Sequence, residues 1–247
     1  PYRAPGTLNV IAHLEHNMGA FFPEKGMREI VTALEQLSVR CGVIIHTGEE
    51  VLSLVKEGRD ITGLETPSGL LSVQAVVSDV DVIPFYRKLM KEERAARKQE
   101  RQERSTSALI FYWAMNRRFE ELDLHNIFFS SDYPGEFRSL RKGEVSTDPT
   151  VYLFASSRVI PSDAPDGKDN WFVMINVPYD RGQEWSRVVS EARRNILVKL
   201  SRRLRYSVEE SIEAEQVLDP PLIEKLTASN RGALYGSSSN SRFAAFR

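Results

Sequence analysis

Two histidines, His13 and His16, lie three residues apart in a predicted helix, which places both side chains on one helix face. A pair at this spacing can share a metal ion, but zinc sites need at least a third protein ligand. No third ligand of suitable type lies nearby, and Cys41 is the single cysteine of the chain. We therefore predict ordinary histidines here and no metal site.

Signatures of common catalytic sites are absent from the sequence. It contains no Gly-x-Ser-x-Gly elbow, no Walker A loop, no His-Glu-x-x-His and no Gly-x-Gly-x-x-Gly after a strand. The glycine- and serine-rich stretch 231–240 could cradle a phosphate through backbone N–H groups, although its composition favours a flexible loop. The residues alone therefore name no catalytic acid or base.

A basic segment at 187–205 has the pattern of an amphipathic helix. Its single acid is Glu191, and its seven basic residues are Arg187, Arg193, Arg194, Lys199, Arg202, Arg203 and Arg205. Such a helix can lie on an anionic membrane surface. Its opposite stripe is Val189, Ala192, Ile196 and Leu200, which a helix packed on its own sheet also requires, so both interpretations stay open. The mixed charges of 91–104 predict a solvated helix or linker.

The elements that must position these residues follow from periodicity. Helices are predicted at 4–18 and from Met27 to Gly42, where apolar residues recur at helical spacing. Short β-type runs follow at 43–47, 51–56, 61–66 and 70–73, with turns that suit a meander, and then a buried-type strand at 75–78.

The second half is richer in strands. Strands are predicted at 107–116, 126–130, 150–156, 171–177 and 212–218, and helices at 133–141 and 184–204. This order predicts an α+β fold with a mostly antiparallel sheet covered by helices, next to part of an α/β domain.

Composition narrows the class of protein. The 247 residues can bury a sizeable core, and a formal net charge of −1 gives no reason to expect nucleic acid as a partner. No apolar run reaches the roughly 18 residues of a spanning helix, and the N-terminus lacks the pattern of a signal peptide. We expect a cytoplasmic protein with peripheral membrane association. Because the sequence opens on Pro1, we also expect it to be a piece of a longer chain.

Several segments, in order, resemble the phytoene desaturase family of carotenoid desaturases, which are flavoproteins with an amine-oxidase-like fold. The similar segments are Pro1-Tyr-Arg-Ala-Pro5, Phe21-Phe-Pro-Glu-Lys-Gly-Met27, Gly42-Val-Ile-Ile-His-Thr-Gly-Glu-Glu-Val51, Val76-Val-Ser-Asp-Val-Asp81, His125-Asn-Ile-Phe-Phe-Ser-Ser-Asp132, Asp148-Pro-Thr-Val-Tyr152, Ala164-Pro-Asp-Gly-Lys168 and Gly232-Ala-Leu-Tyr-Gly236. Each segment is weak evidence, but their shared order spans nearly the whole chain.

The resemblance implies an organisation and an FAD cofactor. Residues 1–23 would supply a substrate-domain helix, 24–85 part of the flavin-binding domain, 86–230 the substrate-binding domain, and 231–247 a return toward the flavin domain. The cofactor contacts implied are Gly26, Met27, Val51, Ser78 and Asp79. Lys25 replaces the family's first glycine and Asp79 its usual asparagine. The family's glycine-rich flavin segments are absent, so an incomplete FAD site is expected.

The implied activity is desaturation of C–C bonds in an acyclic carotenoid, either phytoene-like or hydroxylated, with the chain by itself inactive. Candidate lining residues for the apolar substrate are Phe111, Trp113, Phe129, Tyr152 and Trp171. Two alternatives remain: a flavin-less module that binds a carotenoid or another lipid, and a retinol saturase-like or amine-oxidase-like flavoprotein. The bond oxidised, the number of steps, the electron acceptor and the oligomeric state are not predicted.

Overall fold

The computed structural model describes residues 6–238, so the parts of the expected first and last segments at 1–5 and 239–247 lie outside the described residues. The main unit is a five-stranded antiparallel sheet in the order β5-β6-β7-β4-β8. Its strands are β4 (Ser107–Met115), β5 (His125–Phe128), β6 (Val151–Phe154), β7 (Asp169–Val177) and β8 (Ile212–Leu218). All five correspond to predicted strands, within two residues at most ends.

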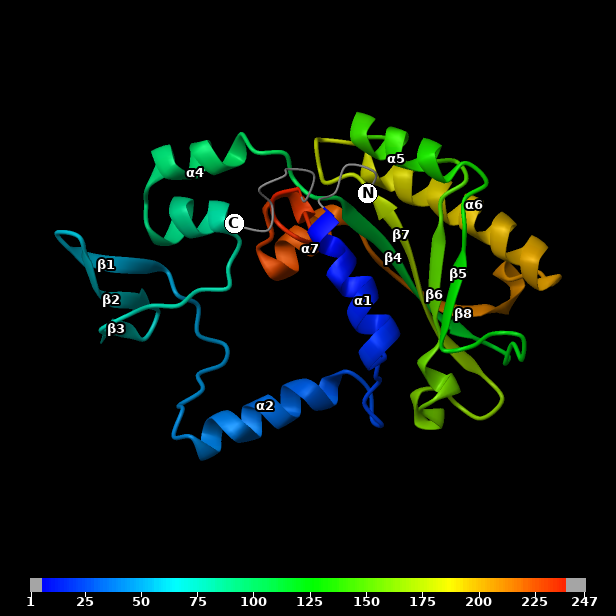
Figure 1. Ribbon diagram of the computed structural model, residues 1–247, viewed down its shortest axis with the longest axis horizontal. Coiled ribbons are helices and arrows are strands. Elements are labelled where there is room, and N and C mark those ends of the chain that lie inside the picture. Colours follow the sequence, from blue (N-terminus) through cyan, green and yellow to red (C-terminus); the bar gives the residue numbers. More distant parts are fainter. Residues whose placement is uncertain (1–5, 239–247) are drawn as a thin grey trace.

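Two helices lie on one side of this sheet, and a third lies on the other (Figure 1). The covering helices are α5 (Tyr133–Lys142) and α6 (Trp185–Leu204). The helix on the other side is α1 (Asn9–Met18), and it buries none of its residues. The predicted α+β class with a mostly antiparallel, helix-covered sheet is therefore confirmed.

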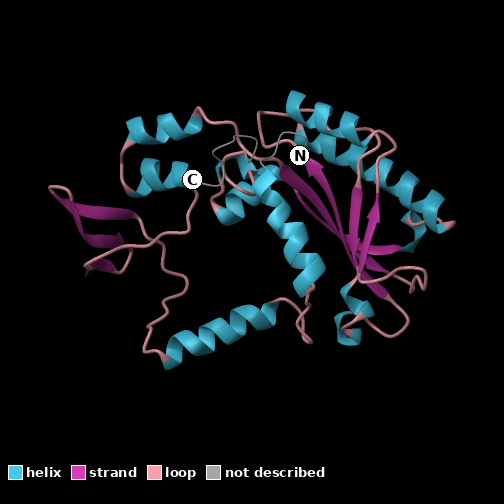
Figure 2. Cartoon of the chain, viewed as in Figure 1, coloured by secondary structure: helices cyan, strands magenta, loops and turns pink. Residues whose placement is uncertain are grey.

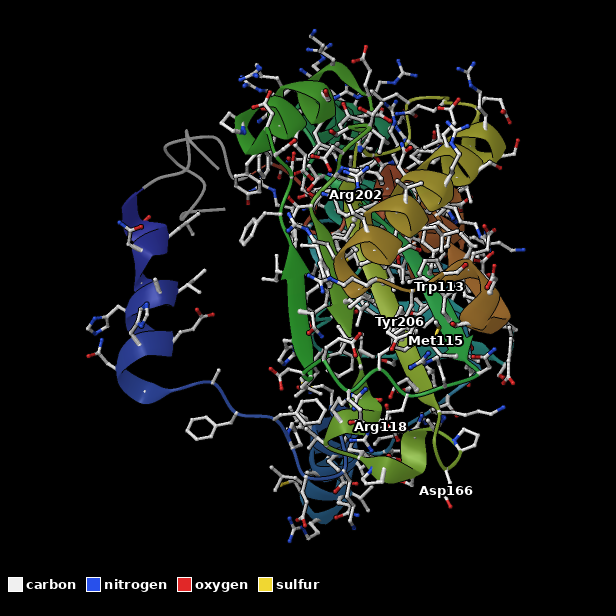
Figure 3. All side chains as sticks on the ribbon, turned by 90° about the vertical axis from the view of Figure 1, so that its right-hand side faces the viewer. Trp113, Met115, Arg118, Asp166, Arg202 and Tyr206 are labelled. Atoms are coloured by element: carbon white, nitrogen blue, oxygen red, sulfur yellow. The ribbon has the colours of Figure 1, made fainter. Side chains whose placement is uncertain are left out.

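The predicted stripe of α6 faces the sheet. Ala192, Ile196, Leu200 and Leu204 recur every four residues and are all buried in the main core. The Glu184 side chain caps the helix by accepting a hydrogen bond from the Arg187 backbone N–H. Figure 3 shows α6 crossing in front of the strands, beside the labelled Trp113.

The first third of the chain is more extended (Figure 2). It contains α2 (Arg28–Arg40), which buries no residue, and a separate antiparallel sheet of β1 (Ser53–Glu57), β2 (Asp60–Thr66) and β3 (Gly69–Ser72). The meander prediction is thus confirmed. The predicted strands at 43–47 and 75–78 are wrong: neither stretch pairs with a strand in the described chain, and Ile44 and Val77 are 79% and 99% exposed. An apolar run becomes a strand only where a neighbour completes its hydrogen bonds.

Short helices connect the two regions. They are α3 (Val82–Pro84), which runs into a π-helical turn at Phe85–Leu89, and α4 (Glu93–Glu100). The last helix, α7 (Pro220–Thr227), follows β8 directly. The charge run at 91–104 is accordingly a mostly solvated helix, as predicted, although its last residue, Arg104, is buried.

Candidate functional site

The five-stranded sheet has one covered face and one open face. Along β7, residues alternate between buried and partly exposed over the whole strand. Trp171, Val173 and Ile175 are buried, whereas Phe172 and Met174 are partly exposed. Because successive side chains of a strand point to opposite faces, the first set lies under the helices and the second set forms the open face.

Three predicted substrate residues belong to the covered face. Phe111, Trp113 and Trp171 are 0%, 1% and 2% exposed, and all three are part of the main hydrophobic cluster with α6. Phe111 is therefore a core residue and not part of the predicted substrate lining. It lies on the face of β4 that points toward α6. Trp113 and Trp171, although their side chains are buried, also line the cavity described below.

The open face carries a complete cross-strand row. Residues paired directly across the five strands are, in order, His125, Phe154, Phe172, Tyr112 and Gln216. Directly paired residues share a face and contact one another. The rings of Phe172 and Tyr112 are 5.5 Å apart in an edge-to-face arrangement, and those of His125 and Phe154 are 5.3 Å apart. The row forms an aromatic floor with a polar residue at each end.

A second row runs beside the first. Its members are Ile127, Tyr152, Met174, Ile110 and Leu218. A cavity of about 570 Å³ lies over the first row, and its lining includes Tyr112, Phe154, Asn170, Phe172 and Gln216. Five strands at a spacing of about 4.8 Å give a floor roughly 19 Å long. This surface can accept a long, flat, apolar molecule lying across the strands.

A polar pair stands at the β5 edge of this surface. The Nδ1 atom of His125 lies 2.8 Å from the Tyr152 hydroxyl oxygen, and the two rings are stacked. Burial raises the pKa of the Tyr152 hydroxyl, so that side chain remains a neutral donor and acceptor. Phe22, from the stretch after α1, packs on Phe154 with ring centroids 5.9 Å apart. Tyr152 is the predicted substrate residue that the structure places on the open face.

Phe129, the fifth predicted substrate residue, lies elsewhere. Its side chain is 62% exposed and lines a second cavity, of about 1090 Å³, next to α6. The basic residues on that cavity are Arg194, Lys199, Arg202, Arg203 and Arg205. Lys199 forms a 2.6 Å ion pair with Asp148 and donates to the carbonyls of Phe129 and Pro149. The four arginines form no ion pair within residues 6–238.

The residues predicted to contact the flavin lie on three separate stretches. Gly26 and Met27 precede α2, Val51 precedes β1, and Ser78 and Asp79 follow β3. Gly26 has φ of +89°, a conformation that other residues rarely adopt, so its backbone can be approached closely. The described chain has no glycine-rich strand–helix turn for a pyrophosphate. These positions are therefore compatible with a few contacts at the edge of a flavin site. Their contacts with the flavin remain a prediction.

A buried junction ties the Ser78–Asp79 stretch to the main sheet. The Asp81 carboxylate pairs with the guanidinium of Arg104 just before β4, and these side chains are 6% and 3% exposed. Asp81 also accepts hydrogen bonds from the backbone N–H groups of Ile83 and Asn230. Sequence reasoning missed this junction because Arg104 ends a charge run that is otherwise solvated. In the sequence, Asp81 stood out only as the last residue of the family-like segment Val76–Asp81, and nothing indicated its partner.

The described residues, 6–238, contain neither a metal-binding cluster nor a membrane-spanning helix. No group of three or more His, Cys, Asp or Glu side chains is placed to bind a metal ion among them. In the same residues, no helix has the length and apolar character needed to cross a membrane.

Comparison with known proteins gives relatives over the full chain. No family model matches the sequence. A 1-hydroxycarotenoid 3,4-desaturase from Flavobacterium sp. (strain P99-3) is 44% identical over all 247 residues, which are 51% of that protein. A 4,4'-diaponeurosporene oxygenase from Staphylococcus haemolyticus (strain JCSC1435) is 31% identical over 240 residues, covering 95% of this chain and 48% of that protein. The chain thus spans about half the length of the curated relatives it matches.

Solved structures with low sequence identity share the fold. An oxidoreductase from Methanosarcina mazei superposes with a TM-score of 0.57 at 15% identity, covering 84% of this chain and 46% of that chain. A redesigned putrescine oxidase superposes with a TM-score of 0.53 at 13% identity. The match covers 90% of this chain and 44% of that chain. The fold is therefore one that oxidoreductases use. In sequence, the chain is similar over its whole length to about half of a carotenoid desaturase, and over 95% of its length to about half of a carotenoid oxygenase.

Proposed function

We propose that the protein to which this chain belongs is an FAD-dependent oxidoreductase that introduces a C=C bond into an acyclic carotenoid. The observation that carries the proposal is the aromatic floor of the open sheet face, in a chain 44% identical to a 1-hydroxycarotenoid 3,4-desaturase. A conjugated polyene is long, flat and apolar, and it matches a surface with these dimensions and rings.

The floor residues bind and orient the polyene. Phe154, Phe172 and Tyr112 offer ring faces and edges along one row, and Met174 offers an adaptable thioether in the next row. Such a surface excludes water from the bound polyene. It also holds one particular C–C bond of the polyene at a fixed position in the site. Bound FAD would supply hydride acceptance. Gly26, Met27, Val51, Ser78 and Asp79 are the residues of this chain that would help to hold it.

A second candidate is oxygenation of a carotenoid, since the next relative is named an oxygenase. The higher identity to the desaturase, 44% against 31%, favours desaturation. A flavin-less carrier remains the alternative from a different class, and it would use the same floor for binding without turnover.

The experiment is an anaerobic titration of the full-length protein with an acyclic carotenoid in lipid vesicles. We expect a bound flavin with visible absorbance, which bleaches as a product with longer-wavelength polyene absorbance appears. A protein that binds pigment but contains no flavin would support the carrier. An oxygenated product, formed only after oxygen is admitted, would support the oxygenase.

We further propose a cytoplasmic protein that docks to an anionic membrane surface through the α6 arginines. The support is the local charge: Arg194, Arg202, Arg203 and Arg205 surround one cavity and are all exposed. Exposed apolar side chains, Ile127, Phe129 and Val198, lie among them. This mixture of cations and apolar groups suits the interface of a bilayer, in which the carotenoid substrate is dissolved.

A further inference from the structure

The cavity of about 1090 Å³ beside α6 is strongly positive. Its described lining contains five basic residues and one acid, Asp148. Lys199 neutralises that acid through their 2.6 Å ion pair. The other four cations are exposed and form no ion pair within residues 6–238; they are Arg194, Arg202, Arg203 and Arg205. Four positive charges therefore line one cavity without a counter-ion in the described part of the chain.

The end of the helix accounts for only part of this charge. Cations in the last turn of a helix stabilise its negative C-terminal end, and Arg202 and Arg203 lie in the last turn of α6. Arg194 lies in the middle of the helix, where this effect gives no reason for a cation. Arg194 and Arg202 stand four residues before and four residues after Val198, so the three side chains share one face of α6. An anion bound between the two arginines would relieve their mutual repulsion.

The guanidinium groups select the kind of anion. Each presents a planar fork of N–H donors, which matches two oxygens of a phosphate group. A phosphate monoester has three terminal oxygens and carries nearly two negative charges, so it can accept from Arg194 and Arg202 together. A phosphate diester has two free oxygens and one charge. The monoester is therefore the better ligand for paired arginines.

The same cavity has apolar walls. Ile127, Phe129 and Val198 are 55%, 62% and 54% exposed and belong to its lining. A free phosphate ester would leave these side chains in water, whereas hydrocarbon attached to the phosphate would cover them. The walls are held together, because Lys199 on α6 donates to the carbonyls of Phe129, which follows β5, and Pro149, which precedes β6. The cavity thus suits a phosphate that is attached to an apolar chain.

We propose that this cavity binds one phospholipid with an exposed phosphomonoester, with Arg194 and Arg202 on the phosphate and Phe129 and Val198 on the hydrocarbon. A headgroup that covers the phosphate with a second ester binds less tightly. This inference rests on the proposed docking to an anionic membrane and adds the headgroup that the membrane presents. It does not depend on which carotenoid the open sheet face binds.

The test uses the full-length protein and two kinds of vesicle with equal surface charge, adjusted to equal electrophoretic mobility. Both contain phosphatidylcholine; one also contains phosphatidic acid, a monoester, and the other phosphatidylglycerol, a diester. In co-sedimentation we expect wild type to bind the phosphatidic acid vesicles about tenfold more tightly, close to the size of one hydrogen bond between charged groups. In Arg194→Gln/Arg202→Gln this preference should fall below about twofold.

Arg94→Gln/Lys98→Gln is the matched control, because it removes two exposed positive charges on α4, outside the cavity. It should keep the tenfold preference. The preference is a ratio of two affinities of the same protein, so it does not depend on the yield of a variant. If the preference survives in Arg194→Gln/Arg202→Gln, the proposed site is wrong.

Glycerol 3-phosphate tests whether the ligand is a lipid. Added at constant ionic strength, in about tenfold excess over the accessible phosphatidic acid, it should leave binding to those vesicles unchanged. Displacement would show that the cavity takes a free phosphate ester and would overturn the lipid assignment. Equal binding of wild type to both kinds of vesicle would overturn the phosphomonoester site and leave electrostatic docking intact, whereas binding to neither would refute the docking itself.

Discussion

The guanidinium of Arg158 and the carboxylate of Asp169 form a buried ion pair with an N–O distance of 2.7 Å and side chains that are 7% and 1% exposed. Asp169 also accepts from the Phe119 backbone N–H and the Ser157 hydroxyl. Arg158 donates to the Phe119 carbonyl. The pair therefore holds two connecting segments against the first residue of β7, on the covered face of the sheet.

Replacing Asp169 by Asn should destabilise the protein by about 3 kcal/mol, because it removes the buried carboxylate and leaves the buried Arg158 guanidinium with only the exposed Glu120 carboxylate, 3.6 Å away. The measurement is urea denaturation of the two proteins followed by tryptophan fluorescence. Glu191→Gln is the control, since it breaks an exposed pair with Arg187 on α6 and should have no measurable effect. Equal stability of Asp169→Asn and wild type would contradict the structural role of the buried pair.

Alanine replacements at Phe111 and Phe172 should separate the two faces of the sheet. Phe111→Ala opens a cavity under α6 and should cost about 3–5 kcal/mol of stability. Phe172→Ala removes part of the floor, so its stability loss should be smaller. The KM for an acyclic carotenoid should rise about tenfold, since the lost apolar contact weakens binding by roughly 1.4 kcal/mol. A normal KM in folded Phe172→Ala protein would exclude the open face as the substrate surface.

Charge reversal on α6 should release the protein from membranes. The variant combines Arg194→Glu, Arg202→Glu and Arg203→Glu and leaves Lys199 intact because that residue is bonded to Asp148 and two carbonyls. At about 1 kcal/mol per cation, binding to anionic vesicles should weaken at least a hundredfold in a co-sedimentation assay. Reversal of Arg94, Arg97 and Lys98 on α4 is the control. If both triple variants sediment like wild type, the α6 surface does not dock to membranes.

Acid should weaken the Asp148–Lys199 connection at a predictable pH. Burial alone would raise the pKa of Asp148, but hydrogen bonds from Lys199 and Ser131 outweigh it and lower the pKa to about 2. A carboxyl group with a lower pKa in the folded than in the unfolded protein stabilises the folded state at pH values above the unfolded pKa, here about 3.9. This stabilisation is lost as the pH falls through the folded pKa of about 2. The stability difference between wild type and Asp148→Asn should therefore shrink between about pH 4 and pH 2. A difference that stays constant over this range in urea denaturation would contradict the lowered pKa.

Much of the local structure follows from periodicity in the sequence. The alternation along Asp169–Val177 predicts a strand with one buried face. Ala192, Ile196 and Leu200 recur every four residues, which predicts a helix packed on a sheet. These patterns depend on neighbours within one element, so they need no knowledge of the rest of the chain. The resemblance carried by ordered short segments predicted a relation to carotenoid desaturases, and a 44% identical relative is named a 1-hydroxycarotenoid 3,4-desaturase.

The sequence by itself therefore determined most of the elements, their periodicity and the group of relatives. Tertiary structure decided which face of each strand is covered: the period of two separates Phe111 and Trp113 from Tyr112, but only the position of α6 shows that the first two are core. It also decided that 43–47 and 75–78 do not form strands, since pairing depends on a partner distant in the chain. The contacts of Asp81 with Arg104 and of His125 with Tyr152 join residues 23 and 27 positions apart. Folding creates such contacts by bringing separate elements together, and no local pattern records them.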